Sequence, residues 1–413
     1  PSPASDTASS AARFAVHAEP DSTLTLPDAP LRLASTAAAD GSHHLTLVPP
    51  TEEGVLRLRV EGLGALAGFE AIVPPIVLRR AERRLVWADL HGHSRLSDGT
   101  GEPEDYFRYA RSVARLDVAA LTDHDHWGVR PLDEDPERSR SLFAAAERFH
   151  APGRFVTLPG FEWTSWLHGH RHVLYFEGEP RIVSSIDPDT DRPDELWAAL
   201  RGESALTFAH HSAGEPIATN WAFPPDPVLE PLTEIVSVHG TSEAADAPSV
   251  VRGGRPGQFV RDVLLGGARL GFVGSGDSHD GHPGLAQLAS GQGGLAGIFT
   301  PRLDRPALLE AMRQRATLAT NGIRPFLEVQ LDGVSMGGML PVDAGTESHL
   351  LEIRYEGTQQ VEAVELIRSG RIAKLGGDGG KRYRLSRRIP ALAAGELHYV
   401  RVLEAGGGCL LYT

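Results

Sequence analysis

The sequence has almost no cysteine and very little lysine. Its single cysteine, Cys409, excludes an internal disulfide framework and a cysteine-rich zinc site. Among 40 basic residues only Lys374 and Lys381 are lysines, and with 54 Asp and Glu the formal charge is −14. An acidic surface repels phosphate backbones, so nucleic acid is not the first partner that we expect.

Long apolar runs are also missing. No stretch approaches about 20 uninterrupted apolar residues, so neither a transmembrane helix nor a membrane partner is expected. The N-terminus has neither the charged start nor the apolar run of a signal peptide, which favours a cytoplasmic protein. At 413 residues and 41% hydrophobic, the chain has the composition of a globular protein. Its length predicts two or three domains, and nothing indicates its oligomeric state.

The beginning of the chain is predicted to be a lead-in followed by a small β domain. Residues 1–20 are rich in Ala, Ser and Pro and are interpreted as a mobile lead-in. Over residues 21–84, short alternating runs such as 44–48 and 55–60 are bounded by Pro, Gly and Asp. This period of two is typical of half-buried antiparallel strands, so we expect an N-terminal β domain here.

Residues 85–322 alternate strand-like and helical patterns, and the remainder returns to strands. We expect strands at 85–91, 118–124, 155–162, 170–176, 206–210, 234–239, 271–275 and 295–300. We expect helices at 102–115, 136–150, 194–201, 258–265 and 305–315. This alternation predicts an α/β fold with a parallel sheet, most simply a barrel. Residues 323–413 contain no long helical pattern and are predicted to form a C-terminal β domain.

Histidine and acidic residues collect where these strands end. Thirteen of the 18 histidines lie between His91 and His282. The ends of successive predicted strands carry the following residues: His91 and His93, His124, Glu162, His210 and His211, His239, and Asp277 with His279. Active sites of parallel α/β folds form at the carboxyl ends of the strands. The pattern therefore predicts a single site there.

Two spacings indicate a metal site. His91 and His93, at i and i+2, lie on the same side of an extended segment, and Asp277 with His279 repeats the arrangement. Imidazole nitrogens combined with carboxylate oxygens suit Zn²⁺, Mn²⁺ or Fe²⁺, whereas Mg²⁺ and Ca²⁺ prefer oxygen ligands alone.

Several ordered motifs resemble the PHP (polymerase and histidinol phosphatase) superfamily. They are DLHGHS at 89–94, SDG at 97–99, LTDHD at 121–125, GFE at 160–162 and GDSH at 276–279. GHR at 169–171 and VHGTSE at 238–243 are similar to an uncharacterised PHP-like branch with β domains on both sides. The specific resemblance covers about residues 85–282. It implies a distorted (β/α)7 barrel with sandwich-like β regions as flanks, and a centre of two or three divalent ions (Mn, Fe or Zn) that hydrolyses phosphoesters.

The resemblance also implies which residues bind metal. One ion is held by His91, His93, Glu162 and Asp277, and Glu162 bridges to a second ion. That second ion takes one histidine from the 170 strand, His170 or His172, and one from the pair His210 and His211. We favour His170 and align His210 with the family's motif, but both choices stay open. A third ion uses Asp98, His124 and His279. Asp98 replaces the family's usual histidine, which favours a harder ion such as Mn²⁺ or Fe²⁺.

The mechanism that follows is hydrolysis by a metal-bridging hydroxide, with the charge on the phosphoryl group neutralised by the ions. Asp125, His126 or His211 is expected to donate a proton to the leaving oxygen. His239 and Arg171 are expected to contact substrate.

The predicted function is thus a metal-dependent hydrolase, foremost a phosphoesterase acting on a phosphorylated small molecule. A carbamate, ester or amide hydrolase is an alternative, because metal-activated water attacks either centre. A third hypothesis is a non-catalytic metal-binding scaffold protein, in which the flanking β domains would carry the function. Trp163, Trp166 and Trp221 could line a pocket, but core packing is the preferred interpretation of each.

Overall fold

The computed structural model describes residues 12–26, 31–37, 43–128, 130–284, 293–341, 345–377 and 379–412. The chain divides into two compact units, Pro1–Ala81 and Glu82–Thr413. The sequence predicted a boundary between residues 84 and 85.

The first unit consists of short antiparallel strands. Its main sheet has the order β2-β1-β6-β7, and two further pairs are β3-β4 and β5-β8. The bounds are β1 (Arg13–Ala18), β2 (Leu31–Ala34), β3 (Thr36–Ala37), β4 (His43–His44), β5 (Gly54–Leu56), β6 (Leu58–Leu63), the 3₁₀ turn η1 (Gly64–Leu66), β7 (Glu70–Ile72) and β8 (Ile76–Leu78). Its core contains Val16, Leu24, Leu26, Leu56 and Leu58.

Two expectations for this unit need correction. The lead-in was predicted to extend to residue 20, but Arg13–Ala18 form β1, which pairs along its whole length with β6. Its residues Phe14, Ala15 and Val16 are buried, so burial fixes a segment whose composition indicated mobility. Residues 1–11 lie outside the described residues. The strand predicted at 44–48 is limited to β4 (His43–His44).

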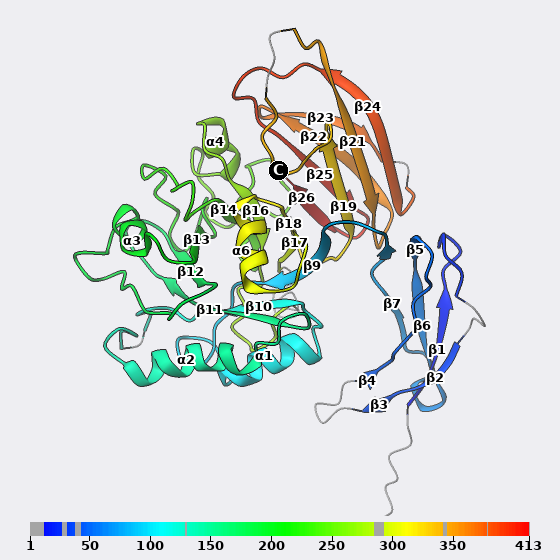
Figure 1. The fold of residues 1–413 in the computed structure, drawn as a ribbon, viewed down its shortest axis with the longest axis horizontal. Coiled ribbons are helices and arrows are strands. Elements are labelled where there is room, and N and C mark those ends of the chain that lie inside the picture. The colour runs from blue at the N-terminus through cyan, green and yellow to red at the C-terminus, as the bar shows by residue number, and fades with distance from the viewer. Residues whose placement is uncertain are drawn as a thin grey trace, which may run out of the picture. The chain divides into compact units, whose positions relative to one another are not determined.

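The second unit is a mixed α/β fold built on one long curled sheet (Figure 1). Its order is β15-β14-β13-β12-β11-β10-β9-β17-β18-β26-β25-β22-β23, with β16 paired to β14. The bounds of the strands before residue 322 are β9 (Arg84–Asp89), β10 (Val118–Leu121), β11 (Val156–Trp163), β12 (Arg171–Tyr175), β13 (Ala205–Ala209), β14 (Leu232–Ser237), β15 (Gly240–Thr241), β16 (Gly271–Gly274), β17 (Leu295–Thr300) and β18 (Thr317–Thr320). Strand β16 also contacts β17 and β18, so the sheet curls back on itself.

The helices lie close to their predicted positions. They are α1 (Pro103–Ser112), α2 (Pro136–Phe149), α3 (Pro193–Leu200), α4 (Val260–Leu265) and α6 (Arg305–Arg313). Helices α1 and α2 pack against each other, α1 on β10 and α2 on both β10 and β11 (Figure 1). Asp135 caps α2 by accepting from the backbone N–H of Arg138 at 3.3 Å. None of these helices in the described part of the chain is both long and apolar enough to cross a bilayer.

The sheet is not uniformly parallel, which corrects the prediction. Strands β9, β10 and β11 are parallel neighbours, as are β13, β14 and β16. Strand β12 is antiparallel to both β11 and β13, and β17 is antiparallel to β9. The connection between β11 and β12, residues 164–170, is short and contains no helix. A connection this short joins antiparallel strands, whereas parallel neighbours need a longer crossover. Strands β9, β10, β11, β13, β14 and β16 therefore present their carboxyl ends at one edge, while β12 and β17 present their beginnings there.

The C-terminal strands continue the same sheet. Residues 323–413 were predicted to form a C-terminal β domain; they do form strands, and β26 (Cys409–Tyr412) pairs with β18 and joins this region to the central sheet. The other strands are β19 (Phe326–Leu331), β20 (Val334–Ser335), β21 (Ser348–Glu356), β22 (Val361–Arg368), β23 (Arg371–Gly376), β24 (Arg382–Pro390) and β25 (His398–Glu404). Strands β20-β19-β21-β24 make a second sheet. Such long-range pairing leaves no local pattern in the sequence.

Candidate metal centre

The loops that follow β9 and β16 are tied together at the base of the site. Gly276 and Gly284 donate their backbone N–H groups to Asp89, at 2.8 and 2.6 Å. His93 donates its backbone N–H to the carbonyl of Ser278 at 2.8 Å. Gly92 is required here, because a Cβ at this position would meet the Tyr106 ring hydroxyl at 2.4 Å. These contacts bring the HGH and DSH segments side by side.

The first group of ligating atoms comes from these two loops. It consists of His91, His93 and Asp277, whose ligand atoms lie within 4.8 Å of one another. Nε2 of His91 is 3.1 Å from Oδ1 of Asp277, and Nε2 of His93 is 3.4 Å from the same oxygen. All three residues are buried.

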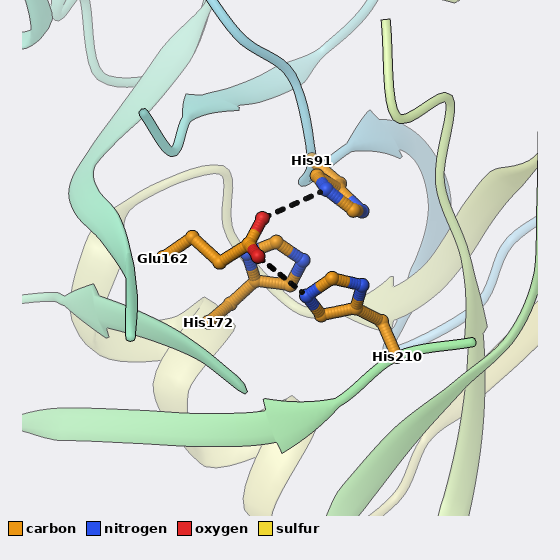
Figure 2. Close-up of side chains that lie close together, drawn as sticks. All are labelled: His91, Glu162, His172 and His210. Atoms are coloured by element: carbon orange, nitrogen blue, oxygen red, sulfur yellow. Dashed lines mark ion pairs between the residues drawn. The ribbon is translucent and has the colours of Figure 1, made fainter. Parts of the chain in front are cut away.

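Glu162 of β11 stands between two sets of histidines. Its Oε2 lies 3.3 Å from Nε2 of His91 and 3.4 Å from Nε2 of His93. Its Oε1 lies 2.8 Å from Nδ1 of His170 and 3.4 Å from Nε2 of His210. Figure 2 shows the two oxygens facing His91 and His210. One carboxylate thus offers a separate oxygen to each of two groups.

The structure brings together both pairs of alternative ligands that the sequence left open, His170 with His172 and His210 with His211. His170 and His172, two residues apart at the start of β12, both belong to possible ligand groups. One group joins His91, Glu162, His172 and His210, and another joins His170, His210 and His211. The rings of His172 and His210 stack at 4.3 Å.

A third group lies nearer to solvent. It consists of His93, Asp98, His124 and His279. Oδ1 of Asp98 lies 3.5 Å from Nε2 of His124 and 3.3 Å from Nε2 of His279. The Asp98 and His279 side chains are 34% and 38% exposed, so this group lies where the cluster meets solvent.

The buried polar atoms of the cluster fit divalent ions. Both oxygens of Glu162, both ring nitrogens of His172 and of His210, Nε2 of His170 and Oδ1 of Asp277 are buried without a hydrogen-bond partner. Leaving so many polar groups unsatisfied is costly unless something else binds them. Nitrogen donors mixed with carboxylate oxygens match the ions expected from the sequence. A buried cluster able to bind divalent metal is therefore present.

The electrostatics of the cluster agree with that use. Burial lowers the pKa of His93 to about 4 and that of His210 to about 3, so both imidazoles are neutral at pH 7. Burial acts to raise the pKa of Glu162, but the nearby His124 and His210 hold it well below its ordinary value. Neutral imidazole and ionised carboxylate are the protonation states that bind metal.

Comparison with known proteins gives distant relatives. The model of a family described as a protein of unknown function, DUF3604, matches residues 133–250. An uncharacterized protein of Chlamydia trachomatis is 25% identical over 338 residues, covering 77% of this chain and 53% of the relative. The chain spans about half the length of the curated relatives it matches.

Two solved structures are also similar. One is a two-domain protein from Bacteroides vulgatus containing a predicted PHP-like metal-dependent phosphoesterase. It is 16% identical with a TM-score of 0.41, covering 79% of this chain and 88% of that one. The other is Endonuclease Q in complex with a 27-mer duplex substrate, 11% identical with a TM-score of 0.34, covering 56% and 57% of the two chains.

Sequence reasoning missed Glu234. This residue lies within β14 and is buried, and its Oε2 is 3.0 Å from Nδ1 of His91. Because a carboxylate accepts, Nδ1 carries the proton and Nε2 of His91 is left to bind metal. Burial raises the pKa of Glu234. An acidic residue inside the otherwise uncharged run 232–237 was the available signal.

Arg171 was predicted to contact substrate, and the structure corrects this. Successive residues of a strand face opposite sides, so Arg171 points away from the face that carries His170 and His172. Its Nε donates to Oε2 of Glu230 at 2.9 Å, and its guanidinium lies over the ring of Trp197. Arg171 and Glu230 form a buried structural ion pair.

Asp125 and His126 lie beside the cluster and are held by hydrogen bonds. Asp125 is buried and accepts from the backbone N–H groups of Thr164 at 3.0 Å and Ser185 at 2.6 Å. Nε2 of His126 accepts from Nε1 of Trp166 at 3.1 Å. His126 therefore carries its proton on Nδ1, which donates to Asp125 at 2.9 Å.

His211 and His239 lie on the cluster itself. The ring of His211 is 4.3 Å from that of His210 and 5.1 Å from that of His239. Nε2 of His239 is 2.9 Å from Oδ2 of Asp277, and its side chain is 36% exposed. The backbone φ is +34° at His211 and +56° at Asp277. Non-glycine residues rarely adopt this conformation, and those that do are often at functional sites.

Proposed function

We propose that this chain is a metal-dependent hydrolase of the PHP type that cleaves a small-molecule phosphoester. The single observation that carries the proposal is the buried Glu162, whose two oxygens each face a separate histidine group. The ordered motifs between residues 89 and 279 support the same assignment.

The ligand assignment is part of this proposal. His91, His93 and Asp277 would hold one ion with Oε2 of Glu162. His170 and His210 would hold a second with Oε1, and a third would take Asp98, His124 and His279. When bound, such ions polarise phosphoryl oxygens and activate water as a nucleophile at neutral pH.

The charge balance of the site favours an anionic substrate only when cations are present. Each ion pair of Asp98, Glu162 and Asp277 in the described part of the chain is formed with a histidine, not with Arg or Lys. The carboxylates alone would repel a phosphate, so substrate binding should depend on metal.

His239 is the residue best placed to protonate the leaving group. Burial acts to lower its pKa, but the hydrogen bond and charge of Asp277 raise it. A protonated imidazole that is partly open to solvent can donate to the leaving oxygen as water attacks phosphorus and the P–O bond breaks. His211, whose pKa burial lowers well below its ordinary value, is neutral and would accept a hydrogen bond from substrate.

The test combines metal analysis with a substrate screen. Purified protein would be stripped with a chelator and reconstituted with Mn²⁺, Fe²⁺ or Zn²⁺. It would then be assayed on phosphomonoesters, phosphodiesters, carboxyl esters and duplex DNA with an abasic site. We expect metal-dependent phosphate release from a small phosphoester. Cleavage of carboxyl esters or DNA alone, or no metal-dependent turnover at all, would contradict the proposal.

A further inference from the structure

The rings at the open side of the cluster form a continuous stack. His279 stacks on His93 at 4.3 Å, and His93 stacks on His124 at 4.4 Å. His124 stacks on Trp127 at 5.3 Å, and Trp127 stacks on Trp166 at 4.3 Å with only 8° between the ring planes. The stack therefore leads from candidate metal ligands to a tryptophan outside the cluster.

Trp166 ends this stack with an open face. The sequence predicted Trp163, Trp166 and Trp221 to be core residues, and Trp163 is fully buried, but Trp166 is 53% exposed. Trp127 covers one face of the Trp166 ring, and no further ring contacts it among the described residues. Trp166 thus presents exposed aromatic surface at the end of a stack that begins in the buried cluster.

The orientation of the Trp166 ring is fixed before any ligand arrives. Its N–H is held by His126, and His126 is held in turn by Asp125, whose carboxylate is fixed by two backbone N–H groups. Because the ring is already ordered, a ligand that stacks on it loses little affinity to ordering the side chain.

We propose that the outer face of Trp166 binds a planar aromatic ring carried by the substrate, so that the enzyme selects phosphoesters of aromatic or nucleoside alcohols. This inference rests on the proposed function for the reaction, but the binding of the ring is independent of turnover. Parallel stacking is favoured for flat rings, and one stacked ring is worth roughly 10-fold in affinity. An uncharged ring also suits a chain whose formal charge is −14.

The test measures binding by calorimetry on metal-loaded protein with phosphonate analogues, which cannot be hydrolysed because a methylene group replaces the bridging oxygen. The analogues of adenosine 5′-monophosphate and of ribose 5-phosphate differ at C1′, which carries adenine in the first and a hydroxyl in the second. Benzylphosphonate and cyclohexylmethylphosphonate differ by ring planarity. We expect the aromatic member of at least one pair to bind about 10-fold more tightly. Preference in the first pair alone identifies a nucleobase, and preference in the second alone identifies an aryl group.

Variants decide whether Trp166 is responsible. Trp166→Ala should abolish the preference, whereas Trp166→Phe, which keeps a ring but loses the N–H to His126, should retain most of it. Leu167→Ala, at a neighbouring side chain that is 77% exposed, is the matched control and should change nothing. Equal affinities within both pairs, or a preference that survives Trp166→Ala, would overturn the inference. Ring-dependent binding without any phosphoester hydrolysis would instead remove the proposed function and leave the ring site standing.

Discussion

Replacing Glu162 by Gln tests the central feature of the site. The amide keeps the volume of the side chain but removes its charge, and it presents an NH₂ group to one of the two histidine groups. A unit charge pair about 4 Å apart interacts by about 4 kcal/mol at an effective dielectric constant of about 20. That energy corresponds to about 10³-fold in binding. We therefore expect the variant to lose at least one ion and at least about 10³-fold in turnover.

The assay measures turnover and metal content on the same preparations. Circular dichroism should show an intact fold, because the substitution leaves the apolar layers unchanged. Glu137→Gln makes the same chemical change at an exposed position of α2 and serves as the control. A Glu162→Gln protein that keeps about a tenth of wild-type turnover with full metal occupancy would show that this carboxylate is not shared between ions.

Four further outcomes are expected. Elemental analysis after growth with Mn, Fe and Zn should find two or three ions per chain, and one or none would contradict the proposed ligand sets. Glu234→Gln should weaken metal binding about 10- to 100-fold, measured by chelator competition. The reason is that the glutamine amide lacks the negative charge that orients His91 through its Nδ1–H. Arg171→Met should destabilise the fold by about 3–5 kcal/mol in urea unfolding, since it leaves Glu230 buried and unpaired, and an effect on KM without one on stability would refute this. Burial lowers the pKa of His398 from 6.5 to about 4, so the unfolded state binds the extra proton between these values and stability should rise with pH across this window. Across this pH window the free energy of unfolding should rise by about 2 kcal/mol, after allowance for the partial exposure of His398. The variant His398→Leu should lose this pH dependence, measured by urea unfolding at several pH values.

Local patterns in the sequence determined most of the elements. The predicted helix at 136–150 is α2 (Pro136–Phe149), and the strand predicted at 295–300 is β17 (Leu295–Thr300). These segments carry their signals within themselves, as periodicity, a capping aspartate or a first-turn proline. The residue types of the metal cluster were available in the same way, because they follow strands at recognisable spacings.

Only the tertiary structure decided how these segments meet. The reversal of β12 brings the beginning of that strand to the cluster, the partner Glu230 holds Arg171 on the opposite face, and the pairing of β26 with β18 joins the C-terminal strands to the central sheet. The roles of Glu234 and Trp166 also depend on partners far along the chain or on exposure to solvent, neither of which a local pattern encodes. The spacing of histidine and acidic residues along the sequence thus predicted a metal site, while strand direction and long-range packing determined which side chains belong to it.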